Sequence, residues 1–167
     1  MAVKQWNVGD VLTASDMNAW AVPLAGVKSA DQTIISNATL INDADMRFAM
    51  SASSIFEFHC YVRFSSGTGQ DLKVSFSVPA GADARFNAIR KDLTGTFAGD
   101  GDWNAASSVT AQGAGVGSAN ARTMILTGVA FTAGTAGNLI FQWAQNTSGA
   151  FNTTLYQYSY ITGRRVG

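Results

Sequence analysis

The stretch "SIFEFHCYVRF", residues 54–64, decides the fold class because its apolar residues recur at every second position. One face of an extended chain would carry the apolar members, Phe56, Phe58, Cys60, Val62 and Phe64. The other face would carry Glu57, His59, Tyr61 and Arg63. A period of two is the repeat of a β-strand and does not fit a helix. The sequence therefore predicts a strand with one buried side and one wetter side.

Alternation continues in "LKVSFSVP", residues 72–79, after the turn-like segment "SSGTGQD". The two runs together predict an antiparallel hairpin. Further short strands are predicted on either side of a polar turn at residues 42–45, and then within residues 122–132, 138–145 and 153–166. Gly128 inside the first of these three indicates a bulge or a close backbone approach. Residues 94–121 are rich in Gly, Ala, Ser and Asp, and are predicted to be exposed loops with at most one or two short strands.

About eight to ten strands, spaced by roughly ten residues, are typical of a sandwich or jelly roll. We therefore predict an all-β protein whose residues 29–167 form one antiparallel β-sandwich, jelly-roll-like in layout. Residues 1–28 are predicted to be an N-terminal arm. Val8, Gly9 and Asp10 should form a turn, and Thr13 begins a capping-box spacing that ends at Asp16.

A short helix is predicted to follow this cap. Met17, Trp20 and Leu24 fall on one helical face, and Pro23 stops the helix. A helix of roughly eight to ten residues is too short to hold together alone in water. The arm therefore needs something to dock against.

Composition narrows the function classes. The 167 residues hold 11 basic and 11 acidic side chains, and only 13% of the chain is charged while 47% is hydrophobic. A balanced charge offers no electrostatic footprint for nucleic acid or an anionic membrane, so neither is expected as a partner. Low charge instead favours a surface that is covered by sister subunits or by a larger assembly. One cysteine excludes an internal disulfide, and no signal peptide or membrane-spanning run is apparent, so synthesis in a cytoplasm is expected.

Candidate catalytic residues are few, and we predict a non-enzymatic protein without a cofactor or bound metal. His59 shares a face with Glu57, but no serine elbow or second histidine accompanies it. Cys60 is predicted to be a small buried hydrophobe. Asp100 with Asp102, and Asp43 with Asp45, could each begin a calcium loop or supply the carboxylate pair of a polysaccharide hydrolase, but polar turns explain both pairs better.

Exposed aromatic residues suggest contact surfaces. Tyr156, Tyr158 and Tyr160 alternate along the last predicted strand, and packing against another layer or a neighbouring chain is the favoured interpretation. The alternative is stacking on a sugar, in which Trp103 of the glycine-rich centre would take part. A carbohydrate-binding module therefore stands as a second hypothesis from a different class.

Three stretches in order resemble small virion structural proteins of tailed bacteriophages, particularly minor tail or fibre proteins of siphoviruses. They are "WNVGDVLTASDMNAW" (residues 6–20), "ADQTIISNATLINDADMRFAM" (residues 30–50) and "LIFQWAQNTSGAFNTTLYQYSYITGRRV" (residues 139–166). The resemblance covers both ends of the chain and skips residues 83–121. Capsid decoration proteins and head fibres share the design of an anchoring arm and a small β domain, so the resemblance leaves tail and head open.

The resemblance implies a virion protein, made in the cytoplasm of a bacterial host, that self-associates as a homotrimer and joins other virion proteins. The anchoring side chains would be Trp6, Leu12, Met17, Trp20 and Leu24. Assembly would use Tyr156, Tyr158 and Tyr160, and Trp103 would be free to meet a host surface glycan. The glycine-rich centre would be either an exposed contact tip or a strap between subunits.

Overall fold

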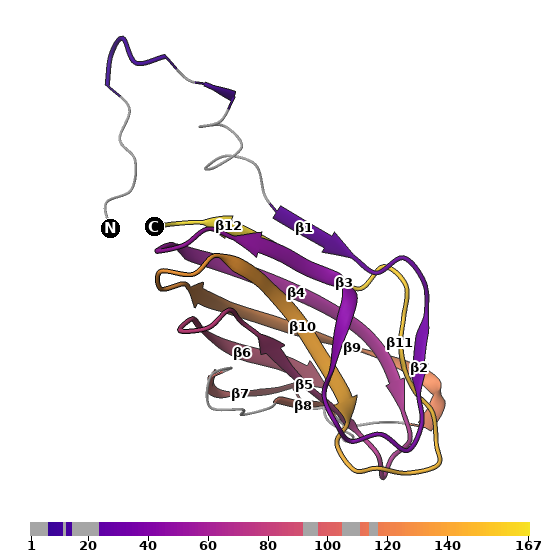
Figure 1. Cartoon of the computed structure of the whole chain (residues 1–167). Helices are drawn as coiled ribbons and strands as arrows, with labels where there is room; N and C mark the ends of the chain where they lie inside the picture. The colour runs from indigo at the N-terminus through magenta and orange to yellow at the C-terminus, as the bar shows by residue number, and fades with distance from the viewer. Residues whose placement is uncertain (1–6, 12, 15–23, 92–96, 105–110, 114–116) are drawn as a thin grey trace.

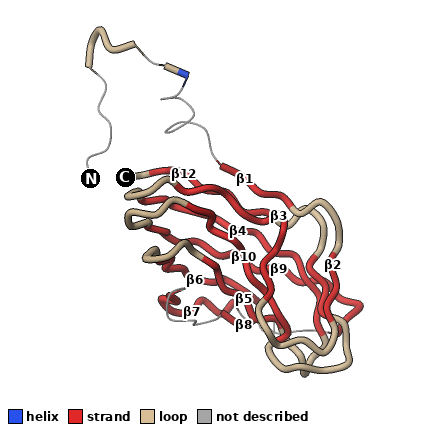
Figure 2. Tube along the Cα trace, in the orientation of Figure 1, coloured by secondary structure: helices blue, strands red, loops and turns tan. Residues whose placement is uncertain are grey.

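The computed structural model describes residues 7–11, 13–14, 24–91, 97–104, 111–113 and 117–167, with the backbone alone for those within 91–118. Two antiparallel sheets face each other across one core (Figures 1 and 2). In chain order the strands are β1 (Leu24–Val27), β2 (Gln32–Ile34), β3 (Ile41–Met50), β4 (Ile55–Ser66), β5 (Leu72–Ser77), β6 (Asp83–Lys91), β7 (Phe97–Asn104), β8 (Ala111–Gly113), β9 (Gly117–Phe131), β10 (Gly137–Gln145), β11 (Thr153–Leu155) and β12 (Tyr160–Arg165). The predicted all-β sandwich is confirmed.

The strand order is that of a jelly roll. The larger sheet runs β1-β12-β4-β9-β6-β7, with β11 and β2 joined beside β4, and the smaller sheet runs β3-β10-β5-β8. Eight strands form the framework: β1, β3, β4, β5, β8, β9, β10 and β12. Numbered 1 to 8 in that order, they are arranged 1-8-3-6 in the larger sheet and 2-7-4-5 in the smaller sheet. That is the double-sheet arrangement of a jelly roll. The β6–β7 hairpin extends the larger sheet beyond this framework.

The core lies between the sheets and is rich in aromatic rings. Phe76 of β5 is its centre, because its ring lies 4.8 Å from that of Phe58 and 4.9 Å from that of Phe86, measured between centroids. The Phe141 ring of the smaller sheet lies 5.9 Å away. Each contact is edge-on, the geometry that aromatic pairs prefer. The predicted inward face of residues 54–64 is confirmed, since its five apolar side chains are all buried.

The predicted hairpin of residues 54–79 is wrong. β4 belongs to the larger sheet and β5 to the smaller one, so the segment between them crosses the sandwich. Both strands turn their apolar faces to the same core, which is why each alternates. Alternation reports a buried face and carries no information on whether the next strand is a neighbour or lies opposite. Among the described strands, β6 and β7 are the only consecutive ones that pair.

The predicted turn at residues 42–45 is also wrong, since β3 runs through it as a bulge. The pairing of β3 with β10 shifts so that residues 43–46 lie opposite Phe141. The Asp43 carboxylate oxygen Oδ1 accepts hydrogen bonds from the backbone N–H groups of Asp45 (3.0 Å) and Met46 (2.9 Å). A side chain that binds nearby backbone N–H groups in this way commonly marks a turn, and here it holds a bulge.

The predicted strand over residues 153–166 is two strands separated by a turn. Tyr158 has a φ of 67°, a left-handed conformation that interrupts an extended chain. The Ser159 hydroxyl donates to the Tyr156 carbonyl oxygen at 2.8 Å and accepts from the Arg63 N–H at 3.0 Å. These bonds fix the turn between β11 and β12.

Two further corrections concern the centre and the start of the chain. The predicted loops of residues 94–121 contain β7, β8 and the beginning of β9, and residues 83–91 form β6, a strand that the predicted set omits. β1 begins at Leu24, inside the predicted arm of residues 1–28, and pairs with β12. The division into an arm and a sandwich stays a prediction, with the sheet starting at Leu24.

Candidate functional site

The predicted anchoring residues lie mostly outside the described part of the chain. Four of them lie outside it: Trp6, Leu12, Met17 and Trp20. The predicted helix also lies outside the described residues, except for Ala14 at its start. Leu24 does not belong to that helix: it opens β1 opposite Gly163 and packs against the core. The predicted turn before the helix is confirmed, because the Asp10 N–H donates to the Asn7 carbonyl oxygen at 3.1 Å and Gly9 has a φ of 98°.

The three predicted assembly tyrosines do not form one stripe. Tyr156 is half-buried, donates its hydroxyl to Ser65 Oγ at 3.1 Å and lies under the Arg63 guanidinium, 4.6 Å from the ring centroid. Tyr160 is half-buried and lies parallel to Tyr61, with centroids 5.7 Å apart. Tyr158 is different, since 71% of its surface is exposed at the turn between β11 and β12.

The candidate aspartates fall into two groups. Asp100 and Asp102 lie on β7, as does Trp103, which is opposite Phe86 in register; their side chains are not described. Asp43 and Asp45 are structural, because Asp43 forms an ion pair with Lys28 at 2.7 Å and Asp45 accepts the Ser29 N–H at 2.9 Å. Among the described residues, no three His, Cys, Asp or Glu side chains are grouped to hold a metal ion.

Cys60 is buried in the core, as predicted. Burial, reinforced by the negative charge of Asp43, raises the pKa of its thiol well above the ordinary value. A thiol held in its protonated form is neither a nucleophile nor a metal ligand. The role of Cys60 is therefore to fill space in the hydrophobic core.

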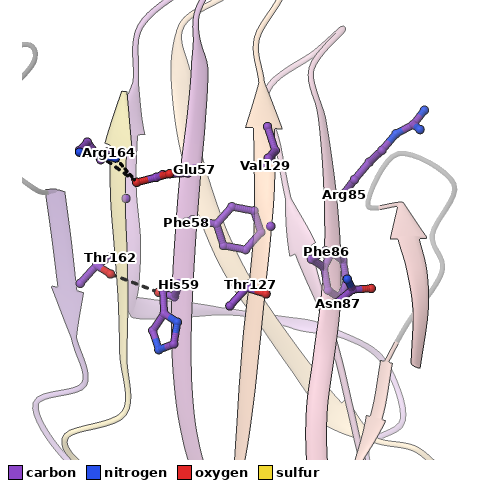
Figure 3. Close-up of a pocket in the computed structure, with 12 residues that line it drawn as sticks. Glu57, Phe58, His59, Arg85, Phe86, Asn87, Thr127, Val129, Thr162 and Arg164 are labelled. Atoms are coloured by element: carbon purple, nitrogen blue, oxygen red, sulfur yellow. Dashed lines mark hydrogen bonds and ion pairs between the residues drawn. The ribbon is translucent and has the colours of Figure 1, made fainter. Parts of the chain in front are cut away.

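A depression crosses the outer face of the larger sheet (Figure 3). It has a volume of about 860 Å³, within the range of small-molecule sites. Outward-facing residues of four adjacent strands line it: Thr162 and Arg164 of β12, Glu57 and His59 of β4, Thr127 and Val129 of β9, and Arg85 and Asn87 of β6. Phe58, Phe86, Gly128 and Gly163 complete the lining. We call this depression the outer groove.

Strand register arranges the outer groove in rows. Thr162 lies opposite His59, His59 opposite Thr127, and Thr127 opposite Asn87, so one polar row crosses all four strands. The next row along the strands consists, by the same pairing, of Arg164, Glu57, Val129 and Arg85. Residues directly opposite on antiparallel strands share a face, so each row presents its side chains together.

Gly128 lies in the middle of the outer groove's lining, and a side chain there would point into the core, because Gly128 is opposite the buried Phe58 and Phe86. A Cβ there would collide with the Arg85 carbonyl oxygen and would lie 2.7 Å from Phe58 Cζ. The prediction of a close backbone approach at Gly128 is confirmed. Phe58 and Phe86 lie opposite Gly128 and fill, on the core side, the space that its missing side chain leaves. Both residues also border the outer groove.

The charges of the outer groove are balanced internally. Arg164 donates to Glu57 Oε1 from Nη2 at 2.8 Å and from Nε at 2.9 Å. Arg85 Nε lies 3.6 Å from Asp83 Oδ2. Each cation thus has an acidic partner at the rim.

A separate exposed apolar set lies along the edge formed by β1, β2 and β11. Its members are Val27 (52% exposed), Ile35 (53%), Phe151 (63%) and Tyr158 (71%). The Tyr158 N–H donates to the Lys28 carbonyl oxygen at 3.0 Å, which places Tyr158 near Val27 at one end of the edge. The Ser36 N–H donates to the Gly149 carbonyl oxygen at 3.0 Å, which brings the segments of Ile35 and Phe151 together at the other end. We call this set the apolar edge. Only Tyr158 of it was singled out from the sequence.

Sequence reasoning missed most of the outer groove. His59 was considered for catalysis, whereas Asn87, Thr127 and Thr162 were not singled out. The one feature of the sequence that these three residues share is a position on the outward face of a strand whose apolar and polar residues alternate. Which outward positions meet depends on the pairing of strands far apart in sequence, and a single sequence does not contain that register.

Comparisons with known proteins give no family. No protein-family model and no curated protein matches the chain. Within the described residues, no helix has the length and apolar character needed to cross a membrane.

Similarity to solved structures is weak, as three of them show. The chain resembles a chain of the tripod from the baseplate of bacteriophage Tuc2009, with 11% identity and a TM-score of 0.37, over 99% of this chain and 79% of that one. It also resembles the D431N mutant VP2 protein of infectious bursal disease virus in derived T=1 particles (10% identity, TM-score 0.21, 99% and 44% covered). Infectious bursal disease virus strain Gx follows (9% identity, TM-score 0.17, 87% and 39% covered). At these identities and TM-scores the similarities assign no function to the chain.

Proposed function

We propose that the chain is a non-enzymatic structural protein of a tailed-bacteriophage virion, of the minor tail or tail-fibre type. In this proposal the segment before Leu24 attaches the protein to a neighbouring virion protein, and the sandwich associates with its own copies as a homotrimer. The ordered resemblance of residues 6–20, 30–50 and 139–166 to such proteins supports the class. A capsid decoration or head-fibre role uses the same two parts and is the alternative.

The apolar edge is the observation that carries the self-association. It gathers Val27, Ile35, Phe151 and Tyr158 in exposed positions on a chain of which only 13% is charged. Such sets mark interaction sites, because large exposed apolar groups gain free energy when a partner removes them from water. Of the three tyrosines predicted to lie at the assembly interface, we therefore propose only Tyr158 as a contact between subunits. Tyr156 and Tyr160 contact Ser65 and Tyr61 of their own chain.

Leu24 is a poor probe of the proposed anchor. Leu24 pairs in the sheet, so its substitution would disturb the fold as well as the attachment. Trp20 and Met17 precede the sheet and are the sharper probes. We assign the attachment to Trp6, Leu12, Met17 and Trp20.

Two substitutions in the full chain test both parts. Phe151→Asp places a charge on the apolar edge and should convert a trimer to a monomer in sedimentation velocity. Trp20→Asp should leave the trimer intact but prevent incorporation into virions, when the variant is supplied from a plasmid to a phage with a disrupted copy of the gene. Ile89→Asp, on the outer sheet face at 45% exposure, is the matched control for an added charge.

The two experiments test self-association and attachment independently. A monomeric wild-type chain, or a Phe151→Asp variant that stays trimeric, contradicts assembly through the apolar edge. Normal incorporation of Trp20→Asp contradicts the anchor. Fractionation of virions into heads and tails then distinguishes the tail role from the head role.

A further inference from the structure

We propose that the outer groove binds a neutral saccharide. This function does not depend on the virion role, because it rests on the geometry of the larger sheet alone. The groove lies on the outer face of β12, β4, β9 and β6. None of its lining residues belongs to the apolar edge, although β12 is hydrogen-bonded to β1 of that edge.

The polar row supplies hydrogen bonds suited to sugar hydroxyls. Thr162, His59, Thr127 and Asn87 offer two hydroxyls, an imidazole and an amide, in that order. The Thr162 hydroxyl donates to the His59 carbonyl oxygen at 3.5 Å and can still accept (Figure 3). The other three groups can both donate and accept, as a sugar hydroxyl does. Adjacent strands are about 4.8 Å apart, so the row extends roughly 14 Å across the sheet. That length exceeds one sugar ring and suits an oligosaccharide.

The row beside it supplies an apolar surface. By register it consists of Tyr160, Tyr61, Ile125 and Ile89. Tyr61 and Tyr160 are nearly parallel, with 19° between their planes, and the His59 ring lies 6.1 Å from that of Tyr160. Tyrosine combines an apolar ring with a polar tip. A sugar has the matching character, with C–H groups on its faces and hydroxyls at its rim.

Charge balance favours a neutral ligand over an anionic one. Arg164 is bound to Glu57 by two short hydrogen bonds, and Arg85 has Asp83 beside it. A phosphate, sulfate or carboxylate would have to compete with these acidic partners. A neutral saccharide can accept hydrogen bonds from the same guanidinium groups while the ion pairs stay in place.

A titration of the full-length protein tests the proposal. The probes are neutral tetrasaccharides of glucose, galactose and N-acetylglucosamine, each added to millimolar concentration and followed by calorimetry and by ligand-observed NMR. We expect saturable binding of at least one probe. Asn87→Ala removes one hydrogen-bonding group and should weaken that binding about three- to tenfold. Thr127→Tyr keeps a strand-favouring residue and fills the groove, so it should abolish binding.

Asn138→Ala is the matched control for Asn87→Ala, because Asn138 is an exposed asparagine on β10 of the smaller sheet, outside both the outer groove and the apolar edge. It should bind the saccharide as the wild type does. The proposal is overturned if no probe binds, or if Asn87→Ala and Thr127→Tyr bind unchanged. It is also overturned if Thr127→Tyr alters the mass of the assembly while no probe binds, since the groove would then be a subunit interface. Circular dichroism of both variants identifies a loss of binding that comes from misfolding.

Discussion

Lys28 Nζ lies 2.7 Å from Asp43 Oδ2, and both side chains are buried where β1 passes β3. Lys28 also donates to Gln32 Oε1 at 2.9 Å, while the second Asp43 oxygen holds the β3 bulge. This ion pair joins the larger sheet to the smaller one at the corner of the sandwich.

Removing either charge of this pair should strongly destabilise the fold. A buried charge left without its partner costs about 3–5 kcal/mol in the free energy of unfolding. We expect this loss for Lys28→Met and for Asp43→Asn, the latter keeping an oxygen for the bulge. The double variant should lose less than the sum, because no unpaired charge remains. Urea unfolding measures all three, and strictly additive losses would contradict the coupling.

The exposed pair Arg164–Glu57 is the control for that measurement. Its side chains are 56% and 51% exposed. Exposed ion pairs contribute about 0–1 kcal/mol, so Arg164→Ala should change the unfolding midpoint little.

Gly128→Ala should destabilise the larger sheet. The new Cβ would collide with the Arg85 carbonyl oxygen, a backbone atom that moves only with its strand. We expect a loss of about 1–3 kcal/mol, the usual cost of overpacking. Gly134→Ala is the matched control, since nothing lies within 4 Å of its Cβ position, and its effect should stay within about 0.5 kcal/mol. Equal thermal midpoints for the two variants would refute this account of Gly128.

Asp45 should contribute to the acid sensitivity of the fold. The Ser29 N–H and hydroxyl bind its carboxylate and lower its pKa below the ordinary value. The stabilisation is therefore complete above the unfolded carboxyl pKa, about 3.9, and is lost as the pH falls through the folded value. The free energy of unfolding should fall more steeply in acid for the wild type than for Asp45→Asn. Parallel curves below neutral pH would show that this carboxylate plays no part.

Cys60 should be unreactive until the protein unfolds. Its thiol is completely buried and its pKa is raised by burial. Iodoacetamide should leave the native chain unmodified and should modify it fully in denaturant, as measured by mass spectrometry. Rapid modification of the native chain would indicate that the core between the sheets opens readily.

The sequence predicted the elements whose signal is local. The alternation of apolar residues predicted the buried face of β4. Three residues predicted the turn at Gly9, and a glycine within a strand predicted the close backbone approach at Gly128. Pairing partners were not readable, because β4 meets β9 and β12 from distant parts of the chain. The outer groove follows from that pairing, so it could not be predicted from one sequence.

Two failures have a more specific cause. Asp43 resembled a turn residue because its side chain does bind nearby backbone N–H groups, but the result is a bulge inside β3. The Tyr158 turn was hidden because tyrosine rarely adopts a left-handed conformation. Asp43 stays in a strand because β3 pairs with β10 and Asp43 binds Lys28. Tyr158 adopts the left-handed conformation in a turn that the hydrogen bonds of its own N–H and of the Ser159 hydroxyl hold in place.

The pairing of β1 with β12 has a consequence for biosynthesis. The first and last strands of the sandwich are hydrogen-bonded neighbours, so the larger sheet cannot be completed until Arg165 has left the ribosome. Most contacts join residues far apart in sequence, a topology of high contact order that folds slowly. A chain interrupted during translation would lack the strand that covers β1 and β4, leaving Leu24 and Cys60 without their neighbours. Completion of the fold thus marks a chain that has been translated through β12.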